Sequence, residues 1–311
     1  MKPLGGEKRY QDYPTYLKEL FGERVQKLSV DAGFTCPNRD GTRGSGGCTF
    51  CNNESFNPDY CRAVSGIAGQ LEAGRAFFTR KYSGQKYLAY FQAYSNTYAP
   101  LEVLRQKYEE ALACPDIVGL VIATRPDAVS DETLDYLAEL SRRTYLCVEY
   151  GVESVNEEVL RTIRRGHTFR EAAERIEQTA RRGIRIGAHL IFGLPGESRE
   201  SMLEGAVRLC DLPIQVLKLH QLQIIRHTPM ALEYERHPEA FRLYSCDEYL
   251  DFVGEVIGRI RPSVYLERFV NQAPEEYLVA PKWGVKNYEF VAKLEKRLRE
   301  KDIWQGKYYQ K

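Results

Sequence analysis

The sequence predicts a parallel α/β fold, and two observations carry this prediction. Short apolar runs rich in Val, Ile, Leu, Tyr and Phe alternate with longer runs whose apolar residues recur every three or four positions. This strand-then-helix unit repeats six times, which favours parallel strands with right-handed crossovers. Six units are fewer than the eight of a closed TIM barrel. An open partial barrel and a doubly wound sheet both fit the pattern.

The six predicted strands are bounded by turn residues and are apolar on both faces, as expected for strands buried on both sides. They cover residues 24–30, 86–93, 117–123, 145–150, 184–192 and 214–224. The predicted amphipathic helices follow them in order. They cover residues 62–82, 101–113, 131–142, 155–182, 198–210 and 248–260.

The ends of the chain fall outside these units. Residues 1–24 form a predicted helical lead-in, residues 25–261 the β/α core, and residues 262–311 a C-terminal extension. The extension is expected to hold a short strand, a loop with Trp283 and a basic amphipathic helix near residues 287–301. No internal repeat or low-complexity linker argues for a further division.

Composition narrows the class of protein. Of the 311 residues, 43% are hydrophobic and 28% are charged, which excludes disordered, collagen-like and coiled-coil chains. The net charge of +1 indicates no overall attraction to nucleic acid or to an anionic membrane. The sequence has no stretch of eighteen apolar residues and no apolar signal core among its first thirty residues. We therefore expect a cytoplasmic protein without a membrane partner.

Three of the eight cysteines lie in one loop after the first predicted strand. Cys36, Cys48 and Cys51 have the spacing Cys-x11-Cys-x2-Cys, and five glycines between positions 33 and 47 let the backbone fold back. A structural zinc ion needs a fourth ligand, for which Cys61 is the candidate. An iron–sulfur cluster with three cysteines would leave one iron open. The place of the loop, after a strand of a β/α series, favours a functional site.

The loop and several later segments resemble the radical S-adenosylmethionine (SAM) superfamily, in particular the branch that includes the elongator catalytic subunit. Phe50 stands where this superfamily has an aromatic residue before the last cysteine. The gap of eleven residues is longer than the usual three, and longer gaps occur in the elongator branch. Four segments resemble this branch, at residues 124–127, 148–154, 165–168 and 192–196. Three others resemble the YhcC/YtqA-type subgroup, at residues 91–100, 218–223 and 277–283.

This resemblance implies a partial (β/α)6 TIM-like barrel and a radical SAM enzyme. Cys36, Cys48 and Cys51 would be the catalytic metal ligands of one [4Fe–4S] cluster. The cluster, reduced by a donor such as flavodoxin or ferredoxin, would cleave SAM to a 5′-deoxyadenosyl radical that takes a hydrogen atom from the substrate.

The resemblance also assigns cofactor-binding residues at the strand ends. Phe50, Gln92, Ser95, Asn96, Thr97, Glu149, Ser154, Arg165, His189 and Gly193 are the candidates. The superfamily's usual Gly-Gly-Glu segment is missing, and Gln92 to Thr97 stand in its place. Glu149, taken to end the fourth strand, would hold the ribose hydroxyls; a buried pair with an arginine is the alternative. Arg165 would clamp the methionine carboxylate, and Ser154 would add a ribose or carboxylate contact.

Candidate substrate contacts are weaker. Asp127 follows the third strand, and a helix cap is its structural alternative. His220 and Gln223 end the sixth strand, where hydrogen bonding in the core is an equal alternative. Residues 161–185 and 282–311 each carry a net charge of +5, and the second stretch also holds Trp283, Trp304, Tyr308 and Tyr309. Such patches bind phosphates and stack on bases, although solvated faces have the same composition.

The resemblance points to tRNA as the substrate, because the elongator branch acts on wobble uridines. The expected target is a 5-substituent of the carboxymethylaminomethyl type. Two alternatives stay open. One is a radical SAM enzyme that acts on a small metabolite or a protein, and the other is a non-enzymatic binding module built around a zinc loop.

Overall fold

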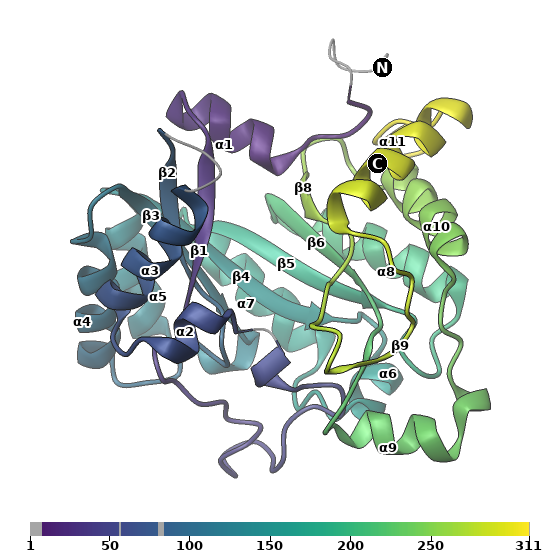
Figure 1. The fold of residues 1–311 in the computed structure, drawn as a ribbon, viewed down its shortest axis with the longest axis horizontal. Helices are drawn as coiled ribbons and strands as arrows, with labels where there is room; N and C mark the ends of the chain where they lie inside the picture. Colours follow the sequence, from purple (N-terminus) through teal and green to yellow (C-terminus); the bar gives the residue numbers. More distant parts are fainter. Residues whose placement is uncertain (1–7, 56, 80–83, 311) are drawn as a thin grey trace.

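A computed structural model describes residues 8–55, 57–79 and 84–310 of the chain. Its main feature is a curled sheet of seven parallel strands in the order β1-β2-β3-β4-β5-β6-β8, which forms an open half-barrel (Figure 1). The strands are β1 (Val25–Val30), β2 (Lys86–Phe91), β3 (Ile117–Thr124), β4 (Tyr145–Glu153), β5 (Arg185–Phe192), β6 (Val216–Gln221) and β8 (Tyr265–Arg268). The predicted partial barrel is confirmed, and β8 adds a seventh strand to the six predicted.

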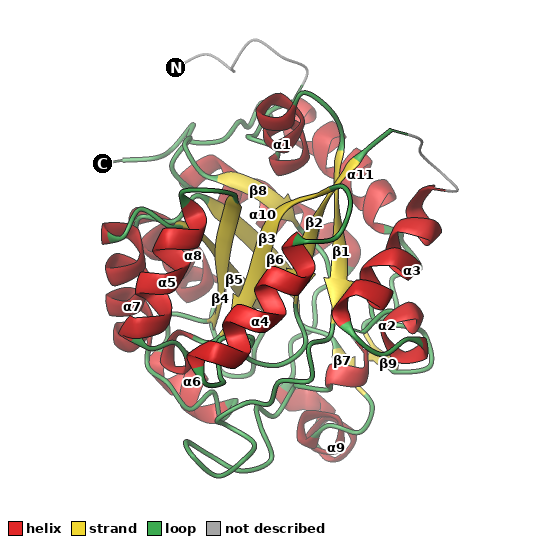
Figure 2. Ribbon diagram, turned by 90° about the vertical axis from the view of Figure 1, so that its left-hand side faces the viewer, coloured by secondary structure: helices red, strands yellow, loops and turns green. Residues whose placement is uncertain are grey.

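Helices surround the outer face of this sheet (Figure 2). The helices of the described residues are α1 (Tyr13–Phe21), α2 (Asp59–Ala63), α3 (Ile67–Thr79), α4 (Leu101–Leu112), α5 (Asp131–Ser141), α6 (Glu157–Thr162), α7 (Phe169–Arg181), α8 (Arg199–Asp211), α9 (Pro229–Arg236), α10 (Cys246–Arg259) and α11 (Asn287–Glu300). Among the described residues, no helix is long and apolar enough to cross a membrane.

Three predicted elements are split in the structure, and local backbone geometry explains each split. The predicted helix 155–182 is divided into α6 and α7, because Arg164 and Gly166 have φ angles of 51° and 79°. The helix predicted at 62–82 is broken before α3 at Gly66, whose φ is 81°; its predicted end, from residue 80, lies outside the described residues. The strand predicted at 214–224 ends at Gln221, and β7 (Ile224–Ile225) pairs antiparallel with β9 (Leu278–Ala280) instead.

The predicted terminal segments pack onto the barrel. Of the lead-in, residues 1–7 lie outside the described residues, and α1 begins after Asp12, whose carboxylate accepts a hydrogen bond from the Thr15 amide at 3.1 Å. In α11, Phe290, Leu294 and Leu298 are fully buried, and the helix packs beside α10 (Figure 1). The division into lead-in, core and extension stays a prediction, but β8 is part of the sheet.

Two apolar clusters fill the fold. The larger lies mainly between the sheet and the outer helices. The smaller lies inside the curl of the sheet, where Tyr13 and Leu17 of α1 pack against the first residues of the strands. The Tyr13 and Tyr145 hydroxyls are 2.7 Å apart and hydrogen-bonded. Helix α1 therefore closes the amino end of the half-barrel, and the carboxyl end stays open for the loop after β1.

Charged side chains occupy the inner face of the sheet above this cluster. Because side chains alternate along a strand, every second residue faces inward. The inward positions include Lys27 of β1, Glu149 of β4, Lys218 of β6 and Glu267 of β8, which are joined by ion pairs. The inside of the half-barrel thus changes from apolar at the amino end to charged in the middle.

Candidate active site

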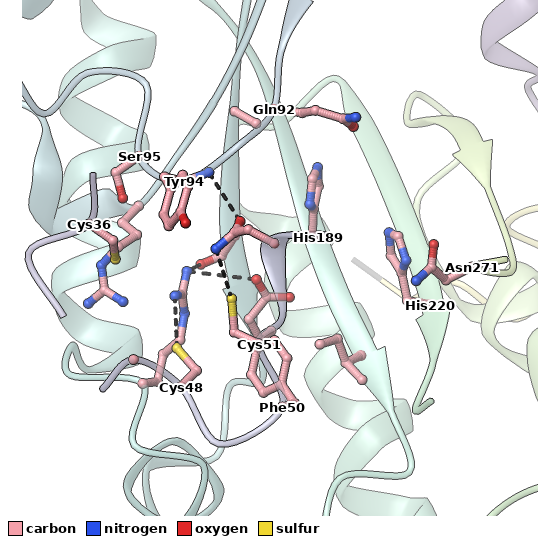
Figure 3. A pocket seen from close by; sticks show the side chains of 18 of the residues that line it. Cys36, Cys48, Phe50, Cys51, Gln92, Tyr94, Ser95, His189, His220 and Asn271 are labelled. Atoms are coloured by element: carbon pink, nitrogen blue, oxygen red, sulfur yellow. Dashed lines mark hydrogen bonds and ion pairs between the residues drawn. The ribbon is translucent and has the colours of Figure 1, made fainter. Parts of the chain in front are cut away.

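A cavity of about 220 Å³ lies at the carboxyl ends of the strands, beneath the loop that follows β1. Cys36, Cys48 and Cys51 line one side of it, and His220 and Asn271 line the opposite side, with His189 between them (Figure 3). The structure therefore brings the three predicted cysteines to one site. Carboxyl ends of strands are where β/α folds bind ligands.

The loop between Cys36 and Cys48 folds on itself. The Arg39 amide donates to the Cys36 carbonyl at 2.8 Å, and the Gly47 amide donates to the Asn38 carbonyl at 2.8 Å. Gly41, Gly46 and Gly47 have positive φ angles of 93°, 78° and 83°, which glycine adopts without strain. The eleven-residue gap is therefore a closed excursion that returns the chain to the cavity at Cys48.

Side-chain N–H groups of three residues lie near the sulfur atoms of Cys48 and Cys51. Arg165 Nη1 lies 3.4 Å from Cys48 Sγ, Asn38 Nδ2 lies 3.5 Å from the same sulfur, and Asn53 Nδ2 lies 3.5 Å from Cys51 Sγ. Without a metal, burial raises the pKa of the Cys51 thiol to about 11. These donors stabilise negative charge on sulfur, which is the state in which cysteine binds iron.

The three thiols around one cavity are compatible with a cluster. Within the described part of the chain, no three His, Cys, Asp or Glu side chains are placed to ligate one metal ion. A cluster takes each thiolate at a different iron, so three thiols around one cavity fit it. Cys61, the candidate fourth zinc ligand, does not line the cavity, and its thiol donates to the Ser29 carbonyl at 3.2 Å.

Arg165 is fixed by the end of β4. Its Nη2 donates to the Gly151 carbonyl at 2.6 Å and lies 3.7 Å from the Glu153 carboxylate. Burial opposes its charge, but Cys48 and Glu153 raise the pKa of the guanidinium, so Arg165 is a cation. A Cβ at Gly151 would lie 2.5 Å from Glu153 Oε1 and 2.8 Å from Arg165 Nη2, so any other residue here would displace one of these side chains. Among the nitrogens of the Arg165 side chain, Nε alone is buried and has no hydrogen-bond partner in the described structure.

Glu149 lies at the floor of the cavity and is in the middle of β4, not at its end as predicted. The strand runs on to Glu153. Lys27 Nζ and Lys218 Nζ contact the Glu149 carboxylate at 2.6 and 2.5 Å, and His189 Nε2 lies 3.0 Å away. Burial alone would raise the pKa of this carboxyl, but the two lysines hold it well below its ordinary value. The buried ion pair that was the alternative to a ribose contact therefore exists, with lysines in place of an arginine.

The other predicted residues divide into two groups. Those that line the cavity are Phe50, Gln92, Ser95, Arg165, His189, His220 and Gln223. Asn96, Thr97, Asp127, Ser154 and Gly193 do not line it. The cofactor and substrate contacts predicted for both groups stay predictions.

Most residues of the second group support the site from behind. Thr97 bridges to Thr124 Oγ1 at 2.6 Å and donates to the Ala128 carbonyl at 2.7 Å, which ties the loop after β2 to the loop after β3. Asn96 Nδ2 donates to the Ala123 carbonyl at 2.9 Å. Asp127 is buried and accepts two hydrogen bonds from Arg125, at 2.9 and 2.8 Å.

Ser154 and Gly193 are engaged elsewhere. The Ser154 hydroxyl donates to the Glu197 carboxylate at 2.7 Å and accepts from the Asn156 amide at 3.0 Å. Gly193, with a φ of 94°, faces Leu222 and Tyr244. Burial raises the pKa of Glu197 to about 7, although the bond from Ser154 opposes this shift.

Replacing Glu197 with glutamine is expected to change how stability depends on pH. A carboxyl whose pKa rises from 4.5 to about 7 on folding favours the folded state fully below pH 4.5, and this contribution is lost as pH rises through 7. At one pKa unit per 1.36 kcal/mol, the Glu197→Gln variant should gain up to about 3 kcal/mol over the parent at pH 8. Urea unfolding at pH 4.5, 6 and 8 measures the difference.

The exposed neighbour Glu200 supplies the control for that experiment. Glu200→Gln should follow the parent chain at all three pH values, because surface substitutions of this kind change stability little. A difference between parent and Glu197→Gln that stays constant with pH would contradict the assignment.

Several cavity residues could not be singled out from the sequence. They are Arg39, Asn53, Tyr94, Arg125, Glu153, Arg268 and Asn271. Glu153 lies within a segment that carried the resemblance, so its motif was a usable signal. Tyr94 and Arg125 also lie within such segments, and Arg39 and Asn53 lie in or next to the cysteine loop. Arg268 and Asn271 belong to no motif and join the site only through the fold.

Comparison with known proteins identifies the family. The profile of the radical SAM superfamily matches residues 39–207, and that of the radical SAM C-terminal domain matches residues 214–300. YtqA of Bacillus subtilis is 40% identical over 98% of this chain and 94% of its own length. YhcC of Escherichia coli is 38% identical over 92% of this chain and 91% of its own length.

More distant similarity extends to elongator complex protein 3. The mouse protein is 29% identical over 50% of this chain and 28% of its own length. The solved structure of Elp3 from the archaeon Methanocaldococcus infernus superimposes with a TM-score of 0.67 at 18% identity, over 90% of this chain and 64% of that chain. This likeness concerns the fold. The superfamily match and the close relatives together show that the chain belongs to the radical SAM superfamily and is a radical SAM enzyme.

Proposed function

We propose that Cys36, Cys48 and Cys51 hold a [4Fe–4S] cluster and that SAM binds in the cavity beside it. The chemistry that this pair supplies when bound is one-electron cleavage of SAM. The support is the donor set of three thiols around one cavity, together with the buried Ser95 hydroxyl, which lines the cavity and has no hydrogen-bond partner among the described residues. A buried polar group without a partner is costly, and a ligand atom would satisfy it.

The chain's own residues orient the bound groups. Arg165 and Asn38 donate N–H groups toward Cys48, which favours its thiolate. Phe50 lines the cavity beside the cysteines, where its apolar ring would exclude water from the bound groups. Ser95 and Gln92 face the cavity from the end of β2, where they replace the missing Gly-Gly-Glu segment. Glu153, at the end of β4, is a further acceptor for the polar groups of SAM.

The proposed substrate is tRNA, and the modified group is the 5-substituent of a wobble uridine, of the carboxymethylaminomethyl type. The observation that carries this proposal is the similarity to elongator complex protein 3 over half of the chain, added to the motifs that resemble the elongator branch. A donor such as flavodoxin or ferredoxin would supply the electron.

Charge near the cavity gives the proposal local support. Lys282 and Lys286 line a neighbouring cavity of about 290 Å³ that shares Asn271 and Gln223 with the active-site cavity. In the described structure neither lysine has an ion-pair partner, so both are available to RNA phosphates. Trp283 between them is not available for stacking on a base, because its indole donates to the Tyr244 carbonyl at 2.9 Å and packs on Phe290.

The other basic stretch gives less support. Most of its arginines are neutralised by acidic residues, several of them outside residues 161–185. The pairs are Arg161–Glu158, Arg165–Glu153, Arg170–Glu174, Arg175–Asp131, Arg181–Glu177 and Arg182–Asp135. We therefore place the proposed RNA contact at the 282–286 loop.

Mass spectrometry of tRNA nucleosides tests the proposal. We expect cells that lack the gene to accumulate an unprocessed wobble uridine, and the parent gene to restore the product while the Cys48→Ala gene does not. Unchanged wobble uridines in the deletion strain would reject tRNA as the substrate and favour a small metabolite or a protein. Purified chain should bind tRNA with an affinity that falls as salt rises, which an enzyme for a small metabolite would not show.

A further inference from the structure

A second cavity opens the active site to the side. It has a volume of about 1020 Å³ and lies between the two edge strands of the half-barrel, β1 and β8, which do not pair with each other. Tyr90, Gln92, Arg268 and Asn271 line both this cavity and the active-site cavity. These four residues therefore lie where the two cavities adjoin.

Arg268 is the residue between these two cavities whose side chain is not held by the fold. It is the last residue of β8 and is exposed, and its guanidinium has no hydrogen bond or ion pair with any described residue. The nearby lysines differ, since Lys27 and Lys218 are both held by Glu149 and Glu267. The guanidinium is close enough to Tyr90 and His220 to influence both electrostatically.

Two more polar groups without partners stand beside Arg268. Nε2 of His220 is buried and has no hydrogen-bond partner in the described structure. The backbone of Asn271 exchanges hydrogen bonds with the Gln221 amide at 3.0 and 2.8 Å, while its own side chain has no hydrogen bond to a described residue. His220 and Asn271 lie side by side across the cavity from the cysteines (Figure 3).

We propose that Arg268, assisted by Asn271 and His220, forms a subsite that binds a carboxylate of the substrate and presents the adjoining carbon to the cysteine side of the cavity. A guanidinium binds a carboxylate through two parallel N–H groups, and an amide side chain adds a further donor. Burial lowers the pKa of His220 well below its ordinary value, so the imidazole adds a hydrogen bond and no charge.

This assignment rests on the proposed function for its natural ligand, because a carboxymethylaminomethyl group ends in a carboxylate. The subsite itself can be tested without RNA. Phenylglyoxal labelling of Arg268, followed by peptide mass spectrometry on the reconstituted full chain with SAM, reports whether an anion covers the guanidinium. Sodium acetate, phosphate and chloride are compared at equal ionic strength, with exposed Arg170 of α7 as the internal control.

We expect acetate to slow the labelling of Arg268 several-fold relative to chloride, with Arg170 unaffected. Equal labelling rates in all three salts would overturn the subsite. Protection by phosphate alone would overturn the choice of carboxylate and assign the residue to the RNA backbone.

Nucleoside binding then tests the natural ligand. The parent chain should bind 5-carboxymethylaminomethyluridine at least about 10-fold more tightly than 5-aminomethyluridine, which lacks the carboxylate, since a hydrogen bond to a charged group is worth about 1.5–3 kcal/mol. Arg268→Gln should abolish this preference and Arg268→Lys should restore part of it, while Arg170→Gln should leave it unchanged. Acetate protection without any preference between the nucleosides would keep the subsite and reject the uridine substrate.

Discussion

Cys48→Ala is expected to abolish cluster-bound iron and the cleavage of SAM while the β/α core stays folded. The substitution removes one of the three proposed ligands and leaves the side chains of Arg165 and Asn38 without their sulfur acceptor. The lost hydrogen bonds cost about 1–3 kcal/mol of stability, which is smaller than the 5–15 kcal/mol typical of a folded domain. Iron and sulfide content after anaerobic reconstitution, 5′-deoxyadenosine formation and circular dichroism measure the three parts of this expectation.

Cys61→Ala is the matched control, because Cys61 is also buried and lies in the next helix of the chain but outside the cavity. It should keep the parent's iron content and cleavage. Cleavage retained by Cys48→Ala, or iron lost equally from both variants, would contradict the assignment of the three ligands.

The sequence predicted those parts of the site that are local in the chain. Cys36, Cys48 and Cys51 lie within sixteen consecutive residues, so spacing and glycine content were enough to place them in one loop. The strand that precedes the loop was equally clear, because parallel strands buried on both faces are read from continuous apolar runs. The pattern predicted a short strand after residue 262 but not that it joins the sheet as a seventh strand, since β8 has only four residues, two of them charged.

Residues that act across the barrel were harder to predict. Arg268 and Asn271 lie more than two hundred residues after the cysteine loop, and their neighbours carry no periodic or motif signal. For Glu149, the need for a buried partner was predicted but the identity of the partner was not. An ionised carboxylate in an apolar run needs a partner, but the partners Lys27 and Lys218 are 122 and 69 residues away and become neighbours only when the sheet curls.

Glu149→Gln is expected to reduce the free energy of unfolding by about 3–5 kcal/mol, the usual cost of removing one partner of a buried ion pair. Glu149 is fully buried and contacts both Lys27 and Lys218, so its loss leaves Glu267 alone to balance two ammonium groups. Urea unfolding at pH 7 measures the loss. Since the pKa of Glu149 is lowered on folding, its contribution is present above pH 4.5 and disappears as pH falls through the folded-state pKa.

Two further variants separate the ion pair from general damage to the core. Glu158→Gln removes a partner of Arg161 in a pair whose side chains are both 72% exposed, and it should cost less than about 0.5 kcal/mol. Lys218→Met in the Glu149→Gln background should recover part of the loss, because Lys27 and Glu267 then balance each other. A double variant as unstable as the sum of the two single variants would argue against the ion-pair assignment.

The expected loss of stability in Glu149→Gln is large because the ion pairs around Glu149 connect three strands of the sheet. Strands β1 and β8 are the two edges of the sheet and share no backbone hydrogen bonds. Lys27 of β1 contacts Glu267 of β8 at 2.7 Å and Glu149 of β4 at 2.6 Å, so one ammonium group links both edges to the centre. This link lies directly beneath the cavity and beside its lateral opening. Weakening it should widen the half-barrel, so SAM binding should fall in Glu149→Gln even where the chain is still folded.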